Sequence, residues 1–225
     1  MPLNPDRFFS PEPSQRQMAH QLYAQVADLP LVCPHGHVEP RLFAAPDYRF
    51  ESPLALIVLP DHYLLRMLHS QGVSLESLGV PTLDGTPYET DPRAAWRRFA
   101  AHFYLFRGTP SGIWLTYVFE QLFGITETLG AETADLFYDH IAACLAESDF
   151  QPRRLYARFK IEALCTTDAA TDTLDQHAAI RQSGWQARIL PTFRPDGVIT
   201  LDARDWRANL DRLAALTNLH IHDYR

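Results

Sequence analysis

The segment IEALCTTDAATDTLDQHAAIRQSGWQARILPT, residues 161–192, decides the fold of this chain. Ile161–Thr167 and Ala187–Thr192 are apolar runs of strand length. Between them, Thr171 or Asp172 can cap a helix. A strand, a helix and a strand within one such span have the size of a βαβ unit, whose crossover is right-handed and whose strands are parallel. The segment therefore predicts part of a parallel α/β sheet.

A further strand is expected upstream, at Leu29–Cys33, where a short apolar run precedes two histidines. It reads as a buried strand. The sequence between this strand and residue 158 is mostly of helical pattern, with Asp91-Pro92 as a typical helix start. We expect an N-terminal segment with the first strand at 1–39, a helical insertion at 40–158, and two further βα units at 159–225. The last residues are expected to break off within an element, before the fold is complete.

The fold class is therefore α/β, with parallel strands and covering helices. The strands found are too few for a closed barrel, which needs eight. An open α/β sheet can be complete with fewer strands, but the phosphate-binding glycine loops typical of many such folds do not occur in the sequence.

Composition limits the classes of partner. The chain has 225 residues, 46% of them hydrophobic, which is enough for a sizeable core. Its net charge is −7 and no basic block occurs, so nucleic acid is not expected as a partner. The longest aliphatic run, Leu54–Leu59, is too short to cross a bilayer. Three cysteines at irregular spacing suit a reducing compartment, so a cytoplasmic location is expected.

His35 and His37 are the strongest candidates for metal ligands. Two residues apart, on a strand or just after its end, both imidazoles lie on one side and can bind a single cation. The alternative is a pair of polar residues in a surface turn. A second pair, His220 and His222, follows a helical stretch, and we expect it to be solvated and to bind no metal.

A second group of polar residues follows Pro60. If Asp61 caps a helix, His62 and Arg66 lie on the same face at positions i and i+4. With Tyr63 they offer an imidazole, a phenol and a guanidinium for general acid–base chemistry on a hydroxylated, anionic substrate. An ordinary capped helix start is the alternative.

Asp168 and Arg194 each follow or end a predicted strand. In parallel α/β folds that edge of the sheet carries the functional site, so both are candidates for substrate binding. Arg194 can make a bidentate contact with a carboxylate or phosphate. The alternatives are that Asp168 caps the next helix and that Arg194 pairs with Asp196.

The order of these motifs resembles that of the uronate isomerases, the glucuronate isomerase group of the amidohydrolase superfamily. The resemblance extends from about residue 5 to 225 and covers roughly the first half of a family member. The motifs, in chain order, are His35-Gly36-His37 with Pro40, Asp61-His62-Tyr63 with Arg66 and Gly72-Val73, Phe123-Gly124-Ile125, Thr166-Thr167-Asp168, the stretch Leu174–His177, and Leu190–Asp196.

The resemblance implies a (β/α)8 TIM-type barrel, incomplete in this chain, with a helical insertion after the first strand. It also implies that His35 and His37 bind a divalent metal, usually zinc, with a third ligand beyond Arg225. Arg194 would hold the carboxylate of a sugar acid, and His62 and Tyr63 would face its hydroxyl groups.

The implied reaction is aldose–ketose isomerisation of a hexuronate through an enediol, glucuronate with fructuronate or galacturonate with tagaturonate. A metal-dependent hydrolase or decarboxylase of the same superfamily, or a non-catalytic fragment, is the alternative. The 225-residue chain is expected to be inactive alone. The possible partners are a small-molecule sugar acid and further copies of the same protein in a homo-oligomer. Cys33-Pro34 and Ala169-Ala170 depart from the family pattern, and these departures bear on which uronate is used.

Overall fold

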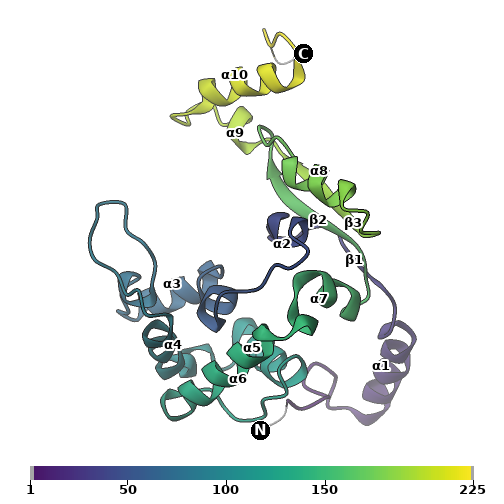
Figure 1. Ribbon diagram of the computed structural model, residues 1–225. Helices are drawn as coiled ribbons and strands as arrows, with labels where there is room; N and C mark the ends of the chain where they lie inside the picture. The colour runs from purple at the N-terminus through teal and green to yellow at the C-terminus, as the bar shows by residue number, and fades with distance from the viewer. Residues whose placement is uncertain (1–2, 224–225) are drawn as a thin grey trace. The chain divides into compact units, whose positions relative to one another are not determined.

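The structure is a computed structural model that describes residues 3–223, and these residues form two compact units (Figure 1). The helical unit comprises residues 3–27 and 49–151. The sheet unit comprises residues 28–48 and 152–223. Each unit is built from two segments that are far apart in the sequence.

The helical unit contains α-helices joined by short turns of 3-10 or π-helix. They are α1 (Pro13–Val26), η1 (Leu54–Val58), α3 (His62–Ser70), η2 (Glu76–Leu78), α4 (Pro92–Ala101), η3 (Phe103–Phe106), α5 (Pro110–Gln121), η4 (Ala131–Thr133), α6 (Ala134–Ala146) and η5 (Ser148–Phe150). The predicted start of α4 is confirmed, since the Asp91 side chain accepts a hydrogen bond from the backbone N of Arg93 at 2.9 Å. No helix among residues 3–223 has the length and apolar composition needed to cross a bilayer.

Aromatic side chains form the core of the helical unit. Phe99, Phe137 and Trp96 are fully buried, and the ring centroids of Phe119 and Phe137 are 5.1 Å apart. The indole N–H of Trp96 donates to the carbonyl of Ala134 at 2.9 Å, which joins α4 to α6. The buried indole N–H of Trp96 is therefore hydrogen-bonded, as burial requires.

The sheet unit is an α/β arrangement around parallel strands. Its elements are β1 (Leu31–Cys33), α2 (Arg41–Ala44), α7 (Pro152–Arg158), β2 (Ile161–Ala169), α8 (Asp175–Gln182), β3 (Arg188–Arg194), α9 (Asp196–Ile199) and α10 (Trp206–Thr217). Within the described residues the strand order is β1-β2-β3, and both pairings are parallel. The predicted βαβ unit is confirmed, with α8 as its crossover helix (Figure 1).

One face of the sheet carries the hydrophobic cluster of this unit. Leu164 and Ile189 pair in register and pack with Ile180 of α8. Phe43 and Tyr156, from α2 and α7, complete the buried set. Burial raises the pKa of the Tyr156 phenol, so its O–H remains protonated and donates to the Glu162 carbonyl at 3.0 Å.

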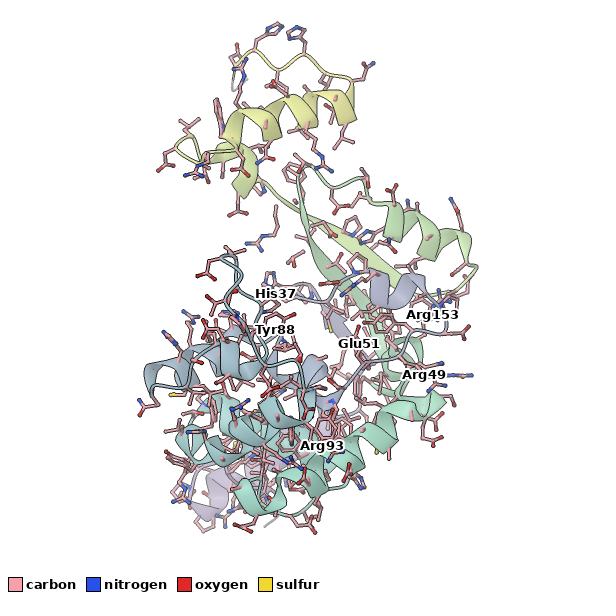
Figure 2. The ribbon with its side chains drawn as sticks, turned by 60° about the vertical axis from the view of Figure 1, so that its left-hand side comes forward. His37, Arg49, Glu51, Tyr88, Arg93 and Arg153 are labelled. Atoms are coloured by element: carbon pink, nitrogen blue, oxygen red, sulfur yellow. The ribbon has the colours of Figure 1, made fainter. Side chains whose placement is uncertain are left out.

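In each unit an arginine side chain joins parts of the chain that are far apart in the sequence. Arg153 of α7 donates from Nε to the carbonyl of Phe43 at 2.9 Å and lies over the ring of Trp185 at 4.8 Å. In the helical unit, Arg49 donates to the carbonyl of Ala146. Both arginines are labelled in Figure 2. The Arg153 contact joins the two segments of the sheet unit, and the Arg49 contact joins the two ends of the 49–151 segment of the helical unit.

Two details of the strand and helix predictions were wrong. The first strand is not buried, since Leu31 is 50% and Val32 is 62% exposed. The reason is that β1 is a short strand at the edge of the described sheet and pairs with β2 alone. Helix α8 begins at Asp175, because Asp172 accepts from the backbone N of Leu174 at 2.7 Å and caps a turn instead.

The boundaries of the two compact units differ from those of the expected segments 1–39, 40–158 and 159–225. Residues 40–48 and 152–158, expected within the helical insertion, pack in the sheet unit through Phe43 and Tyr156. Residues 3–27 belong to the helical unit and not with the first strand.

Replacing Phe99 by Ala is expected to lower the free energy of unfolding by about 3–5 kcal/mol, because it leaves a cavity in a fully buried aromatic core. Urea-induced unfolding followed by tryptophan fluorescence measures the change, since Trp96 lies 5.3 Å from the Phe99 ring. Leu83→Ala is the control: Leu83 is fully exposed, and its change is expected within about 0.5 kcal/mol. Equal effects of the two substitutions would contradict this description of the core.

Candidate functional site

His35 and His37 lie in the loop that follows β1, and their imidazoles converge. The two Nε2 atoms are 2.9 Å apart, and the ring centroids are 4.7 Å apart at an interplanar angle of 76°. Both residues are exposed, and Figure 2 labels His37 in this loop. The predicted convergence of the two imidazoles on one side of the chain is therefore observed.

Gly36 explains why the loop can lie where it does. A Cβ atom on Gly36 would stand 2.9 Å from the carbonyl oxygen of Cys165 in β2. The Thr167 hydroxyl donates to the Gly36 carbonyl at 3.3 Å. The backbone between the histidines thus lies directly against β2, and only a residue without a side chain fits this approach unstrained.

The geometry of the histidine pair fits two ligands of one cation. Two nitrogens at the usual Zn–N distance of about 2.0–2.1 Å and a tetrahedral angle stand about 3.3 Å apart. The observed 2.9 Å is close to this separation, and it also permits an N–H···N hydrogen bond when one ring carries the shared proton. No group of three or more His, Cys, Asp and Glu side chains suited to a metal occurs within residues 3–223. Two imidazoles alone hold a metal weakly.

Arg194 is the last residue of β3 and lies beside the end of β2. It pairs in register with Ala169, and its carbonyl accepts from the backbone N of Ala170 at 2.9 Å. The guanidinium Nε lies 3.5 Å from Asp196 Oδ2, so the ion pair considered as the alternative is present. The Arg194 side chain is 48% exposed, and an ion pair at such exposure is weak. The guanidinium can therefore exchange this partner for an anionic ligand.

Asp168 is buried and takes part in a polar chain within the sheet unit. Its Oδ2 accepts from the Thr166 hydroxyl at 2.7 Å and from the backbone N of Thr192 at 3.2 Å. The alternative in which Asp168 caps the next helix is wrong, because α8 begins at Asp175. The Asp168 side chain instead forms hydrogen bonds within the sheet. The predicted role of Asp168 in substrate binding stays a prediction.

His177 is a residue that sequence reasoning did not single out as part of the site. It is 1% exposed, and its Nε2 lies 2.9 Å from the Thr166 hydroxyl oxygen. The signal was present in the sequence: His177 and Ile180 are three positions apart on one helix face, and Thr166 and Asp168 share one face of a strand. Placing His177 beside Thr166 and Asp168 would have required combining the helical period of the first pair with the strand period of the second.

His62, Tyr63 and Arg66 belong to α3 of the helical unit, whereas the other candidate residues belong to the sheet unit. The predicted cap is confirmed, since Asp61 Oδ1 accepts from the backbone N of Tyr63 at 2.8 Å. The rings of His62 and Tyr63 are 4.2 Å apart, and the Arg66 guanidinium lies 5.1 Å from the Tyr63 ring centroid. The three side chains are thus neighbours at the start of one helix.

The second histidine pair is solvated, as expected. His220 and His222 are exposed and lie beyond the end of α10. Their rings are stacked, with centroids 4.2 Å apart and planes 10° from parallel.

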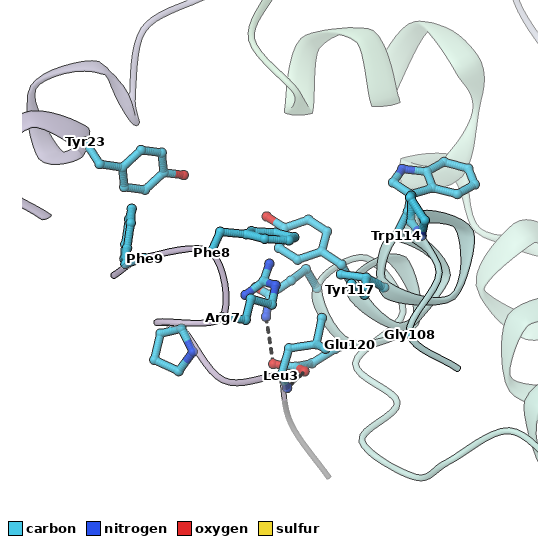
Figure 3. A pocket seen from close by; sticks show the side chains of 13 residues that line it. Leu3, Arg7, Phe8, Phe9, Tyr23, Gly108, Trp114, Tyr117 and Glu120 are labelled. Atoms are coloured by element: carbon cyan, nitrogen blue, oxygen red, sulfur yellow. Dashed lines mark hydrogen bonds between the residues drawn. The ribbon is translucent and has the colours of Figure 1, made fainter. Parts of the chain in front are cut away.

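A cavity of about 860 Å³ lies in the helical unit, where the N-terminal segment meets α5. Figure 3 shows its aromatic lining, which includes Phe8, Tyr23, Trp114 and Tyr117. None of the predicted site residues lines it. The largely aromatic lining of this cavity contrasts with the histidine, aspartate and arginine side chains near the ends of the strands.

The family model described as glucuronate isomerase matches residues 9–225. This chain belongs to the glucuronate isomerase family. The uronate isomerase of Nostoc punctiforme is 52% identical over 222 residues, which are 99% of this chain and 47% of that protein. The uronate isomerase of Rhizobium meliloti is 50% identical over 215 residues, covering 96% of this chain and 46% of its own.

Solved structures of family members agree with the fold described above. The crystal structure of glucuronate isomerase from Caulobacter crescentus is 48% identical and superposes with a TM-score of 0.91, covering 96% of this chain and 45% of that one. The uronate isomerase of Thermotoga maritima is 26% identical with a TM-score of 0.83, over 97% of this chain and 45% of its own. The predicted family is confirmed, and the chain spans about half the length of the relatives it matches.

Gly36→Ala is expected to lower the free energy of unfolding by about 1–3 kcal/mol, because its Cβ would press on the Cys165 carbonyl and push the histidine loop away from β2. Urea-induced unfolding measures the change. Gly130→Ala is the matched control, since Gly130 is in an extended conformation and its added Cβ meets nothing within 4 Å. Indistinguishable effects at the two positions would show that the close approach at Gly36 is unimportant.

Proposed function

We propose that the whole protein of which this chain is part is a uronate isomerase. It interconverts an aldose uronate and its ketose partner, glucuronate with fructuronate or galacturonate with tagaturonate. The observation that carries the proposal is the pair of converging imidazoles at the carboxyl edge of a parallel sheet, in a chain of the glucuronate isomerase family. That edge is where α/β enzymes of this type build their sites.

The reaction moves protons and leaves the carbon skeleton intact. The proton on C2 of the aldose is removed and one is delivered to C1, while the O2 hydroxyl loses its proton and O1 gains one. An enediol lies between the two. Such a reaction needs groups that hold the substrate, groups that move protons between oxygens, and stabilisation of developing negative charge.

Arg194 binds the substrate carboxylate in this proposal. A guanidinium matches a carboxylate through two parallel N–H···O bonds, and the half-exposed Arg194 has only a weak ion pair with Asp196 to give up. Asp168 and Arg66 are proposed to assist in substrate binding. The buried position of Asp168 supports an indirect role, through the backbone of β3.

His62 and Tyr63 act on the sugar hydroxyl groups. An imidazole and a phenol in contact at the start of α3 provide two groups that can each donate and accept a proton. The Arg66 guanidinium over the Tyr63 ring keeps a positive charge beside them, which favours an anionic substrate.

We further propose that His35 and His37 hold a divalent metal, zinc being the ion that imidazole pairs commonly bind. When bound, the metal supplies a Lewis acid for a substrate oxygen. The 2.9 Å separation of the two Nε2 atoms supports this assignment. We propose that a third protein ligand lies outside residues 3–223, since no group of three metal-binding side chains occurs among those residues.

The complete fold is proposed to be a (β/α)8 barrel of the amidohydrolase superfamily. The exposed apolar side chains of Leu31, Val32 and Leu190 support a continuation of the sheet, because such side chains and open strand edges are unfavourable in water. The irregular cysteine spacing supports a cytoplasmic location. Isomerisation is preferred over hydrolysis or decarboxylation, because the family model and the relatives compared above are isomerases.

The metal assignment predicts that the full-length protein loses its bound metal when His35 and His37 are both replaced by Ala. The double variant in which His220 and His222 are replaced by Ala is expected to keep it, because those two rings stack face to face in an exposed segment beyond α10. Elemental analysis after gel filtration measures metal content per chain. Equal metal content in the two double variants would remove the basis for the site.

The substrate assignment predicts that full-length protein, loaded with zinc, interconverts a hexuronate and its ketose partner, as followed by NMR of the sugar. Arg194→Lys is expected to raise KM for the uronate roughly 10- to 100-fold, since one charge-assisted hydrogen bond contributes about 1.5–3 kcal/mol. Arg188→Lys on the same strand is the control, with little change expected. A metal-loaded full-length protein that converts no hexuronate would contradict the proposed function.

A further inference from the structure

A chain of buried hydrogen bonds connects α8 to the end of β3. His177, Thr166 and Asp168 are 1%, 0% and 5% exposed, respectively. Thr166 Oγ1 lies 2.9 Å from His177 Nε2 and donates to Asp168 Oδ2 at 2.7 Å. The same carboxylate oxygen accepts from the backbone N of Thr192 at 3.2 Å. Three side chains and one backbone amide are thus joined in sequence.

The single hydroxyl proton of Thr166 sets the direction of this chain. Thr166 Oγ1 has two acceptors in reach, the Asp168 carboxylate at 2.7 Å and the Leu190 carbonyl at 3.3 Å. In both cases the proton points away from His177, so the bond between Thr166 and Nε2 needs its proton from the imidazole. The arrangement in which the contacts of Thr166 with both Asp168 and His177 are hydrogen bonds therefore has a proton on His177 Nε2.

The other ring nitrogen decides how many protons His177 holds. Nδ1 is buried and has no hydrogen-bond partner among the described residues. The Asp168 Oδ1 atom lies 3.9 Å from Nε2 and would face a charge on the ring, but a second proton on Nδ1 would be a buried donor without a partner, which is costly in a protein interior. The unpartnered Nδ1 thus favours the tautomer whose proton is on Nε2.

The far end of the chain acts on the strand that carries Arg194. Asp168 Oδ2 binds the backbone N of Thr192, two residues before Arg194. This part of β3 is thereby held by a side-chain carboxylate in addition to the backbone pairing of β2 with β3. The backbone of Arg194 is held next to it by the bond from the Ala170 N to its carbonyl.

We propose that His177 is a positioning residue: its Nε2–H orients Thr166, Thr166 orients the Asp168 carboxylate, and the carboxylate holds the end of β3 so that Arg194 meets the substrate carboxylate. The last step rests on the proposed function. The hydrogen-bond chain and its hold on β3 do not, so they are tested separately from activity.

The proton arrangement is tested in the unsubstituted full-length protein by 15N NMR with selective histidine labelling. The His177 signals are assigned by their disappearance in His177→Gln. A protonated Nε2 with a bare Nδ1 is expected. A ring protonated on Nδ1 alone, or on both nitrogens, would overturn the proposal, whatever the activity of the protein.

The hold on β3 is tested by amide hydrogen exchange of the peptide that covers residues 188–194, measured by mass spectrometry on the full-length protein. His177→Leu removes the donor at similar volume and is expected to speed exchange there about tenfold, the effect of a net hydrogen bond. His177→Gln, whose amide N–H can replace Nε2–H, is expected to stay within about threefold of the unsubstituted protein. Ile180→Val, a packing change on the same buried helix face, is the matched control.

Kinetics then connects the chain to the substrate. In His177→Leu the KM for the uronate is expected to rise about tenfold while kcat changes less than about threefold, because Arg194 is displaced and the proton-transferring groups are not. The Gln variant is expected to restore KM. Exchange and KM effects in the Leu variant no larger than those of Ile180→Val would overturn the proposal. A protein without isomerase activity but with fast exchange in the Leu variant alone would refute the proposed function and leave the hold on β3 standing.

Discussion

The parallel pairing of β2 with β1 on one side and β3 on the other is the constraint on which the candidate site depends. Because the strands run in one direction, the residues that follow them meet at one edge of the sheet. His37 follows β1, Thr167 lies near the end of β2, and Arg194 ends β3. A strand of the opposite direction would have taken its polar residues to the other edge.

Close backbone packing turns this shared edge into a defined geometry. The Gly36 backbone lies against the Cys165 carbonyl and accepts from Thr167, so β2 positions the loop in which the two imidazoles converge. On its other side β2 holds β3 through the Asp168 carboxylate. The same strand therefore supports a candidate metal ligand pair and a candidate anion-binding guanidinium, with the buried polar chain from His177 behind it.

Much of the local structure was predictable from short sequence patterns. The strand–helix–strand unit at 161–192 and the helix caps at Asp61 and Asp91 were confirmed, since these depend on residues within one or two turns of each other. The motif order in the sequence predicted the family, which the comparisons confirmed. The roles of individual site residues remain predictions, because they involve a substrate and a metal.

By itself, then, the sequence determined the parallel α/β unit, the helix starts at Asp61 and Asp91, and the convergence of His35 and His37, all of which follow from spacing along the chain. Only the tertiary structure decided that Leu31 and Val32 are exposed, and that Asp168 is bound to Thr166 and Thr192. It also brought in His177, eleven positions from Thr166 along the chain. The physical reason is that burial and long-range hydrogen bonds depend on which distant segments pack together, and no local pattern encodes that pairing.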